Sequence, residues 1–462
     1  MPQWSTSTSD DPLALPQEGL DVGREQHARK SPEDGRRPEH YRLIGIGAGP
    51  ANLSLASLLY EDPTVPNVFF DRKNSFTWHD DQLIAGATLQ VSIFKDLVSL
   101  SDPTNRFSFL SYLHEHGRIY HFLNAQFTEI PRSEFRNYLE WATGKNPNIV
   151  FSETVERVEF DDVFRVVTDR RQVTADNIAV GVGTVRWVPE FAYRHLGKDQ
   201  FHVSEYGQRA ADLAGKRVAV VGGGQSGAEV VLDLLSKLEP ERPAEVQWIS
   251  RRRNYFPLDD STFTNDFFMP DYSDYFFRLP EAARSEINSQ HVLTSDGISE
   301  STLRAIYQEL YRVQFIEQDA RRCTLLPNRA VSSVDQLPDG SWELSLTHND
   351  ERDQTQRAVV DAVVWATGYQ PAPKTFLEPL LGRIETENGE FRVDEDFAVA
   401  WDGPVDRNIF VQNAVRAQRG LPDVNLSLNA WRAQRIANRL RGDPGSEPAV
   451  SFIDWSVKGG RE

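Results

Sequence analysis

The chain has 462 residues, enough for two or three domains, and its formal net charge of -18 at pH 7 argues against nonspecific nucleic-acid binding through clustered Lys and Arg. Its one cysteine, Cys323, excludes an internal disulfide, and we expect no metal site. Because the sequence has neither a secretory signal nor an uncharged apolar span long enough to cross a bilayer, we expect a soluble, cytoplasmic protein.

Residues 1–38 are expected to form a disordered tail, because Ser, Asp, Glu, Arg, Gly and Pro dominate there without apolar periodicity. A short apolar strand then ends at Ile46, and Gly47 and Gly49 let the chain turn into a helix predicted over 52–59. Such a turn can hold a pyrophosphate against the first amides of the helix. It also fits a glycine turn without a ligand, since Asn52 replaces the third glycine of G-x-G-x-x-G.

The strand predicted over Asn67–Asp71 strengthens the dinucleotide interpretation. Its last residue lies roughly 20 residues after the glycines, where a carboxylate commonly binds a ribose hydroxyl. We therefore predict a dinucleotide site that includes Gly47, Gly49, Pro50, Asn52 and Asp71.

The complete G-x-G-x-x-G motif occurs later in the chain, at Gly222, Gly224 and Gly227. An apolar strand precedes it, and a helix is predicted to follow it through Leu235. This segment predicts a second dinucleotide-binding unit.

The next predicted strand, Glu245–Ser250, ends without a carboxylate and continues into Arg251, Arg252 and Arg253. Arginines can bind a 2′-phosphate in forked pairs, whereas a carboxylate would repel it, so this turn favours NADPH over NADH. A solvated turn is the alternative interpretation.

A third apolar stretch is predicted as one buried strand over Val359–Tyr369, which breaks at Ala366-Thr-Gly-Tyr369. Gly368 permits a tight turn against a nucleotide or a domain junction, but the stretch also fits the end of a structural strand. Two dinucleotide folds in one chain suggest a nicotinamide donor that feeds a flavin. We therefore expect FAD at the first motif and NADPH at the second.

Five segments follow one another along the chain: Gly47-Ala-Gly-Pro-Ala-Asn-Leu53, Trp78-His79, Leu89-Gln-Val-Ser-Ile-Phe-Lys-Asp-Leu97, Gly222-Gly-Gly-Gln-Ser-Gly-Ala-Glu229 and Ala366-Thr-Gly-Tyr369. Together they resemble the flavin-dependent amine N-hydroxylases of siderophore biosynthesis, and most closely the lysine N-epsilon-hydroxylase branch. The resemblance covers nearly the whole chain after the tail. It implies that NADPH reduces FAD, that the reduced flavin activates O2, and that an unprotonated amine becomes a hydroxylamine, so the rate should rise at alkaline pH. It also implies a homotetramer.

The resemblance assigns further residues. Cofactor contacts are implied for Trp78, His79, Gln90, Gln225, Ser226, Thr367, Gly368, Tyr369 and Leu426, and catalytic roles for Gln90, Asn413 and Ser427. Trp78 and His79 also fit an aromatic pair that fills the core. Just before Leu426, Gln418-Arg-Gly420 replaces the family's usual Thr-His-Gly, which leaves the local contacts to the flavin open.

Three residues are candidates for substrate binding. Lys95 matches the lysine that binds the substrate carboxylate in the amino-acid hydroxylases of the family. A buried ammonium would attract that carboxylate and repel the second ammonium of a diamine, although Lys95 could instead extend to solvent. Asn265 matches a substrate contact of the ornithine hydroxylases, but Ser295 stands where those enzymes have a second asparagine. L-lysine is therefore the preferred substrate, and ornithine, cadaverine and putrescine remain alternatives.

We predict an α/β fold with two Rossmann-like dinucleotide-binding domains. The FAD-binding domain is expected over 39–212 and 365–455, and the NADPH-binding domain over 213–364. A small, mostly helical substrate-binding insertion is expected at about 255–315. It includes a helix from Glu300 to about Val313, capped by Ser299 or Ser301, whose predicted apolar face is formed by Leu303, Ile306, Leu310 and Tyr311.

The predicted reaction is N-hydroxylation of the L-lysine side chain with O2. A Baeyer–Villiger or S-oxygenating flavin monooxygenase shares the two nucleotide folds and is a more distant alternative. A reductase or nucleotide-binding regulator without oxygenation is another.

Overall fold

The computed structural model describes residues 38–79, 84, 87–89, 91–127, 129–351, 354–445 and 451–456, which belong to one compact unit that begins at Pro38. The tail predicted over 1–38 lies outside these residues except for Pro38, and so does Gln90.

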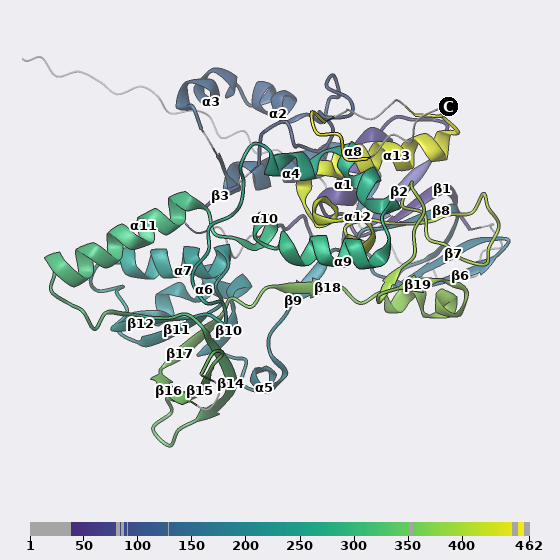
Figure 1. The fold of residues 1–462 in the computed structure, drawn as a ribbon. Coiled ribbons are helices and arrows are strands. Elements are labelled where there is room, and N and C mark those ends of the chain that lie inside the picture. The colour runs from purple at the N-terminus through teal and green to yellow at the C-terminus, as the bar shows by residue number, and fades with distance from the viewer. Residues whose placement is uncertain are drawn as a thin grey trace, which may run out of the picture. The chain divides into compact units, whose positions relative to one another are not determined.

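The first sheet contains β1 (His40–Ile46), β2 (Asn67–Phe70), β5 (Ile149–Val150), β6 (Val155–Asp161), β7 (Val163–Thr168), β8 (Gln172–Val180) and β21 (Ile409–Val411). Its order is β5-β2-β1-β8-β7-β6, and β21 also pairs with β8. Figure 1 labels the run from β2 through β1, β8 and β7 to β6. The strands β5, β2, β1, β8 and β21 run parallel to one another. β7 pairs in antiparallel orientation with β8 on one side and with β6 on the other. Leu43 and Ile44 of β1 are fully buried in different core clusters, because successive side chains point to opposite faces of a sheet that is covered on both sides.

Helices from distant parts of the chain cover one face of this sheet. They are α1 (Pro50–Leu58), α2 (Phe109–Glu115), α4 (Arg132–Lys145) and α13 (Asn429–Arg441), whose apolar residues share a core with Leu43. The 3₁₀ helix Thr375–Arg383 packs in the other core, with Ile44. Helix α1 begins two residues before the predicted position, because Pro50 fits the first helical turn.

The second sheet is entirely parallel, with the order β10-β17-β11-β12-β13. It contains β10 (Gln200–His202), β11 (Arg217–Val221), β12 (Glu245–Ile249), β13 (Cys323–Leu326) and β17 (Ala362–Trp365). Helix α7 (Gln225–Ser236) follows β11 directly, as the second motif predicts. Because β10 pairs with β17, this sheet starts before residue 213, the predicted start of the NADPH-binding domain.

The stretch Val359–Tyr369 is not one strand, in contrast to the prediction. An antiparallel sheet of β14 (Arg329–Gln336), β15 (Trp342–His348) and β16 (Thr355–Val360) takes its first residues, and β17 takes the following ones into the parallel sheet. Asp361, between them, accepts hydrogen bonds from the backbone N–H of Arg217 at 2.8 Å and from its guanidinium at 2.6 Å. This pair fixes the corner at which the chain passes from one sheet to the other.

Two short strands mark the passages between the two large sheets. β9 (Thr184–Arg186) and β18 (Tyr369–Pro371) pair in antiparallel orientation (Figure 1). The backbone N–H of Trp187 donates to the carbonyl oxygen of Gly368 at 2.9 Å.

The predicted insertion is mostly helical, with α8 (Pro270–Arg278), α9 (Glu281–Gln290), α10 (Leu293–Asp296) and α11 (Glu300–Tyr311). The Ser299 hydroxyl accepts a hydrogen bond from the N–H of Thr302, which confirms one of the two predicted caps of α11. Ile306 is buried, but Tyr311 is 56% exposed, so its assignment to the apolar face was wrong. Tyr311 follows Ile306 by five residues, a rotation of about 140° around a helix.

The remaining elements are β3 (Thr88–Leu89), β4 (Ile130–Pro131), α3 (Ile119–Ala125), α5 (Glu190–Tyr193), α6 (Tyr206–Arg209), β19 (Thr386–Glu387), β20 (Glu390–Phe391) and α12 (Arg416–Arg419). The two glycine motifs each lie between a parallel strand and a helix, which confirms the predicted α/β fold with two Rossmann-like units.

Candidate active site

The first glycine loop connects β1 to α1. Gly47 has φ +88°, and a Cβ there would lie 2.6 Å from the carbonyl oxygen of Gly181, so no side chain fits. Gly49 precedes α1 without a side-chain cap, and Pro50 takes the first helical turn. Asp71, predicted as the last residue of its strand, directly follows β2, which ends at Phe70. One of its carboxylate oxygens accepts a hydrogen bond from the N–H of Ala48 at 2.8 Å. The loop therefore presents uncapped helix amides beside a carboxylate, an arrangement that suits a dinucleotide.

Asn52, which replaces the third motif glycine, is completely buried. Its amide nitrogen donates to the carbonyl oxygens of Ile46, Gly47 and Ala179 at 3.1, 2.7 and 3.2 Å. Its amide oxygen accepts from the side chain of Gln412 at 2.6 Å. The side chain thus joins the glycine loop to β8 and to the end of β21, and its predicted contact with a nucleotide stays a prediction.

The second glycine loop is packed against the Ala-Thr-Gly-Tyr segment. Gly222 has φ +144°, and a Cβ there would lie 2.0 Å from the carbonyl oxygen of Ala366. A Cβ on Gly227 would lie 2.5 Å from the carbonyl oxygen of Gly222, so the third glycine allows α7 to approach the loop closely. Gly224 precedes α7 without a side-chain cap, which leaves the helix amides available to a phosphate.

The first turn of α7 carries the predicted residues Gln225 and Ser226. The side-chain oxygen of Gln225 accepts from the N–H of Ser299 at 2.8 Å, and its nitrogen donates to Glu229 at 3.0 Å. Gln225 therefore fixes the start of α11 against the loop. Ser226 is half-buried in the same turn.

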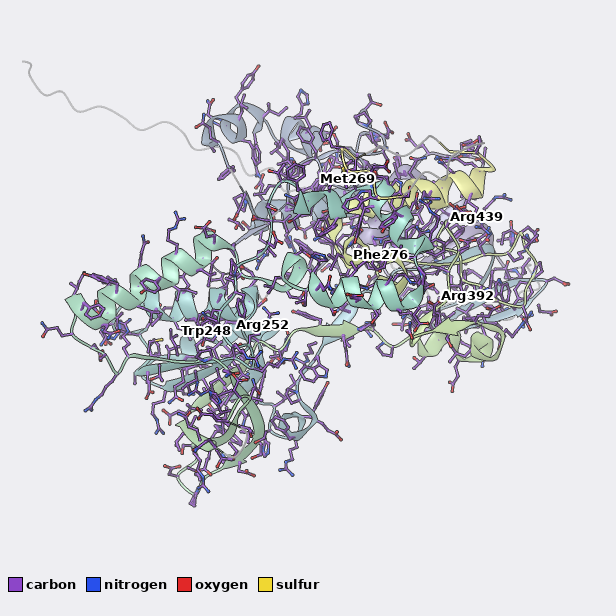
Figure 2. The ribbon with its side chains drawn as sticks, viewed as in Figure 1. Trp248, Arg252, Met269, Phe276, Arg392 and Arg439 are labelled. Carbon is purple, nitrogen blue, oxygen red and sulfur yellow. The ribbon has the colours of Figure 1, made fainter. Side chains whose placement is uncertain are left out.

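Three arginines line a cavity of about 420 Å³ after β12, next to this loop (Figure 2 labels Arg252). Arg252 donates to the carbonyl oxygens of Gly223 at 3.2 Å and Asp296 at 2.7 Å. Arg253 forms an ion pair with Asp350 at 2.7 Å, which lowers the pKa of that carboxyl to about 2. Arg251 is exposed at the cavity. The position suits a 2′-phosphate, with the charge of Arg253 already compensated.

The Ala-Thr-Gly-Tyr segment meets a histidine that the sequence did not single out. The Thr367 hydroxyl donates to the carbonyl oxygen of Trp187 at 2.5 Å, and the carbonyl oxygen of Gly368 accepts from Nε2 of His202 at 3.0 Å. Burial lowers the pKa of His202 to about 4, so this residue is neutral at pH 7. No motif surrounds His202 in the sequence, and only the pairing of β10 with β17 brings it here.

Aromatic rings connect this segment with the predicted flavin contacts. The ring of Tyr369 lies 5.1 Å from that of His202 and 6.5 Å from that of His79, between ring centres. His79 packs edge-on against Trp78 at 4.7 Å, and Trp78 also packs against Phe135 of α4 at 5.7 Å. Trp78 therefore fills part of the core. The ring of His79 lies between Trp78 and Tyr369, the first residue of β18.

Lys95 lies in the loop between β3 and α2. The neighbouring carboxylate of Asp96 is buried and accepts from the N–H groups of Val98, Ser99 and Phe109 at 2.9, 2.6 and 2.7 Å, so it orders the loop. The half-buried ammonium of Lys95 lies 5.6 Å from the ring centre of Phe268. Burial lowers its pKa below the usual range, and no carboxylate within the described part of the chain forms an ion pair with it.

The insertion presents its two predicted substrate residues differently. Asn265 lies with Phe268 in the 3₁₀ turn Thr264–Phe268, and its exposed side chain donates to the carbonyl oxygen of Asp260 at 3.0 Å. The Ser295 hydroxyl donates to the carboxylate of Asp296 at 3.0 Å and accepts from Arg416 at 3.3 Å. The structure therefore brings the turn of Asn265 to Lys95. Ser295 is instead bonded to Arg416 of the return segment, which comprises residues 365–455, the second part of the predicted FAD-binding domain.

The return segment is organised by a buried ion pair. Arg432 of α13 is 1% exposed, donates to the carboxylate of Asp423 at 3.1 Å and also bonds to the side chain of Asn413. Ser427 is buried, and its hydroxyl donates to the side chain of Asn425 at 2.7 Å. Leu426 packs against the core of the first sheet. Asn413 and Ser427 are thus held in place by bonds within the same segment.

These features were compared with known proteins. The model of the family described as L-lysine 6-monooxygenase/L-ornithine 5-monooxygenase matches residues 39–371. The chain belongs to this family.

Individual relatives act on different amines. The L-lysine N6-monooxygenase of Escherichia coli is 39% identical over 422 residues, which are 89% of this chain and 98% of that protein. The FAD-bound cadaverine monooxygenase of Erwinia amylovora is 28% identical with a TM-score of 0.85, covering 91% of this chain and 99% of that one. An ornithine N-hydroxylase of Kutzneria sp. 744, with reduced FAD, NADP⁺ and L-ornithine, is 28% identical with a TM-score of 0.80, covering 87% and 99%.

Membership of the L-lysine 6-monooxygenase/L-ornithine 5-monooxygenase family confirms the resemblance found in the sequence and makes the chain a monooxygenase. It favours amine N-hydroxylation over the Baeyer–Villiger, S-oxygenating and reductase alternatives. The expected cofactors, FAD and NADPH, agree with the FAD and NADP⁺ of the neighbouring structures. Membership of the family does not determine which amine this chain hydroxylates, because its relatives act on different amines. No helix within the described residues is long and apolar enough to span a membrane.

Proposed function

We propose that this family member hydroxylates the side-chain amine of L-lysine with O2 to give N-epsilon-hydroxylysine for siderophore biosynthesis, using FAD and NADPH. The reaction consumes one lysine, one O2, one NADPH and one proton, and forms the hydroxylamine, water and NADP⁺. The cytoplasmic location and the tetramer implied by the resemblance remain predictions.

The two glycine loops support the cofactor assignment. FAD fits the first, where Gly47, Gly49 and Pro50 leave the start of α1 uncapped. NADPH fits the second, where α7 is uncapped and Arg251 and Arg252 line a cavity, with Arg252 bonded to the loop at Gly223. We assign the FAD-binding domain to the first sheet with the return segment, and the NADPH-binding domain to the second sheet. Trp78, His79, Gln90, Thr367, Gly368, Tyr369 and Leu426 are assigned to the flavin environment.

When bound and reduced, FAD supplies an oxygen atom from O2 that can be transferred to an amine. The chain's part is to bind the substrate by its far end and to present an unprotonated amine, whose free pKa is about 10.4. We assign Gln90, Asn413 and Ser427 to the reacting centre, where hydrogen bonds and exclusion of water would favour oxygen transfer over peroxide release.

The observation that supports an amino-acid substrate is the state of Lys95. Its ammonium is half-buried beside the ring of Phe268, and burial lowers its pKa. No carboxylate in the described part of the chain forms an ion pair with it. The carboxylate of lysine would form a charge-assisted hydrogen bond with it, whereas the second ammonium of a diamine would be repelled. Asn265, in the turn that reaches Lys95 through Phe268, is assigned to the same end of the substrate. Ser295 is retained as a more distant substrate residue.

A diamine is the second candidate. The Erwinia amylovora enzyme, a cadaverine monooxygenase, has a TM-score of 0.85 with this chain, and this similarity favours cadaverine or putrescine. Ornithine is a third possibility, represented by the Kutzneria enzyme.

The test is a hydroxylamine assay of the holoenzyme with lysine, ornithine, cadaverine and putrescine, with hydrogen peroxide release measured beside each. Lysine should give the highest kcat/KM and the least peroxide per NADPH consumed. Faster and better coupled turnover of cadaverine would overturn the assignment of Lys95 as the residue that binds the substrate carboxylate.

A further inference from the structure

A fully buried guanidinium joins the insertion to the return segment. Arg419, at the end of α12, has no exposed surface and donates to the carboxylate of Asp274 in α8 at 2.9 Å. It also donates to the carbonyl oxygens of Asp394, at 3.2 Å, and Glu395. Burial lowers the pKa of Arg419 to about 10, and nearby Asp274 opposes this shift, so the guanidinium stays charged at pH 7.

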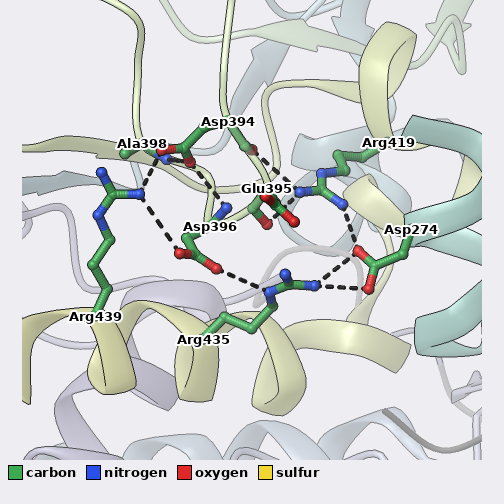
Figure 3. A network of polar contacts seen from close by, with 8 residues as sticks. All are labelled: Asp274, Asp394, Glu395, Asp396, Ala398, Arg419, Arg435 and Arg439. Atoms are coloured by element: carbon green, nitrogen blue, oxygen red, sulfur yellow. Dashed lines mark hydrogen bonds and ion pairs between the residues drawn. The ribbon is translucent and has the colours of Figure 1, made fainter. Parts of the chain in front are cut away.

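Asp274 is shared by a second arginine (Figure 3). Arg435 of α13 reaches both carboxylate oxygens of Asp274 at 2.8 Å and contacts Asp396 at 3.1 Å. Arg439, one turn further along α13, pairs with Asp394 and lies 3.6 Å from Asp396. One carboxylate of the insertion therefore receives cations from both α12 and α13.

The contact between α8 and α12 is close as well as charged. The Arg419 guanidinium lies 4.1 Å from the ring centre of Phe277. The Ser273 hydroxyl donates to the backbone carbonyl oxygen of Arg419 at 3.4 Å. Gly420 has φ +79°, and a Cβ there would lie 3.2 Å from the ring of Phe276. A shift of α8 would break ionic, hydrogen-bond and packing contacts together.

The ion pairs of Asp274 with Arg419 and Arg435 form a joint between α8 and the return segment. Each side of this joint is close in sequence to residues assigned to the active site. α8 begins two residues after Phe268, whose ring contacts Lys95. Figure 2 labels Met269, just before α8, and Phe276 within it. On the other side, Arg419 precedes Ser427 by eight residues. The joint therefore ties α8, which follows the turn of Phe268, to the segment that leads to Ser427.

We propose that Asp274 and Arg419 are positioning residues that hold the turn Thr264–Phe268 against Lys95 and so place the amine for oxygen transfer. This inference rests on the proposed amine N-hydroxylation but does not depend on which amine is preferred. The joint sets how tightly the amine is bound and what fraction of the O2 consumed is used to form hydroxylamine. It leaves the reduction of the flavin by NADPH unchanged.

The decisive variant is Asp274→Asn, which keeps the size of the side chain and removes its charge. We expect the KM for the best amine to rise about tenfold and the hydroxylamine formed per NADPH consumed to fall. O2 that is reduced but not transferred to the amine should be released as hydrogen peroxide. The rate of flavin reduction by NADPH should change less than twofold. Hydrogen exchange of amides 264–278 should become faster, while exchange in α4 stays the same.

Asp62→Asn is the matched control. Asp62 pairs with Arg441 of the same helix α13 at 2.7 Å, and the hydrogen bonds of its side chain within the described residues go to Thr64 and Arg441 rather than to α8. The variant should therefore leave KM, coupling and exchange of 264–278 unchanged. Equal effects of the two variants, or no effect of Asp274→Asn on KM and coupling, would overturn the proposal. If Asp274→Asn does not fold, Arg435→Gln removes the more accessible contact to Asp274 and must shift the same quantities in the same direction.

Failure of the proposed function has a different signature. In that case the wild-type enzyme would form no hydroxylamine with any of the four amines. The exchange measurement would still decide whether Asp274 holds the turn: unchanged exchange of 264–278 in Asp274→Asn rejects the joint itself.

Discussion

Asn52 and Lys95 show two opposite consequences of burying a polar side chain. Asn52 has hydrogen bonds from both ends of its amide to groups that are distant in sequence, Ala179 and Gln412. Lys95 is desolvated next to Phe268 without a carboxylate in the described residues. A buried polar group with all its partners stabilises the fold, whereas a desolvated charge without a partner suits a ligand of opposite charge.

Introducing the glycine of the motif at position 52 should therefore destabilise this protein. Asn52→Gly leaves the side chain of Gln412 and the surrounding carbonyl groups without their partner, and we expect the free energy of unfolding to fall by about 2–4 kcal/mol. Urea unfolding of the holoenzyme measures the change. Asn124→Gly, at an exposed position of α3, controls for glycine in a helix; an equal loss in both variants would contradict the role of Asn52.

The sequence identified the position of Asn52 but not its function. A departure from G-x-G-x-x-G is visible in the sequence, while the partners that explain it come from β8 and from the residue after β21. His202 was missed for the same reason, because its partner Gly368 is 166 residues away.

At the scale of elements, the turn after β12 contains two arginines, Arg251 and Arg253, that look equivalent in the sequence but differ in their contacts. Arg253 is neutralised by Asp350, whereas Arg251 is exposed at the cavity without an ion pair in the described residues. We expect Arg251→Ala to raise the KM for NADPH about tenfold and that for NADH little, because one charge-assisted contact to the 2′-phosphate is lost.

Arg253→Ala is the matched control for this prediction. Its effect on the KM for NADPH should stay below about threefold, since its charge is already compensated by Asp350. Steady-state kinetics with both nucleotides would measure it. Equal effects of the two variants on NADPH and NADH would show that the turn does not read the 2′-phosphate.

Elements next to the glycine motifs were predictable because the signals are local: an apolar run, a glycine turn and a helix start. The stretch Val359–Tyr369 was not, because an apolar run does not reveal that Asp361 pairs with Arg217 and divides the run between two sheets. The antiparallel sheet of β14, β15 and β16 was missed as well.

At the scale of the whole molecule, the candidate site combines segments that are far apart in the chain. The loop of Lys95, the insertion and the return segment meet through Phe268 and through the pairs of Asp274 with Arg419 and Arg435. The resemblance indicated which segments take part. It could not indicate this joint, because the sequence gives no sign that Gln418-Arg-Gly420 faces α8.

The central claim is that the lone ammonium of Lys95 selects an amino acid over a diamine. The most direct measurement is a competition in which the holoenzyme receives equal amounts of L-lysine and cadaverine with NADPH and O2, and the two hydroxylamines are quantified by mass spectrometry. Their ratio equals the ratio of the kcat/KM values. We expect N-epsilon-hydroxylysine to exceed N-hydroxycadaverine by at least about tenfold, and Lys95→Met to lower this ratio by about a hundredfold. Predominance of N-hydroxycadaverine, or a ratio that Lys95→Met leaves unchanged, would contradict the claim.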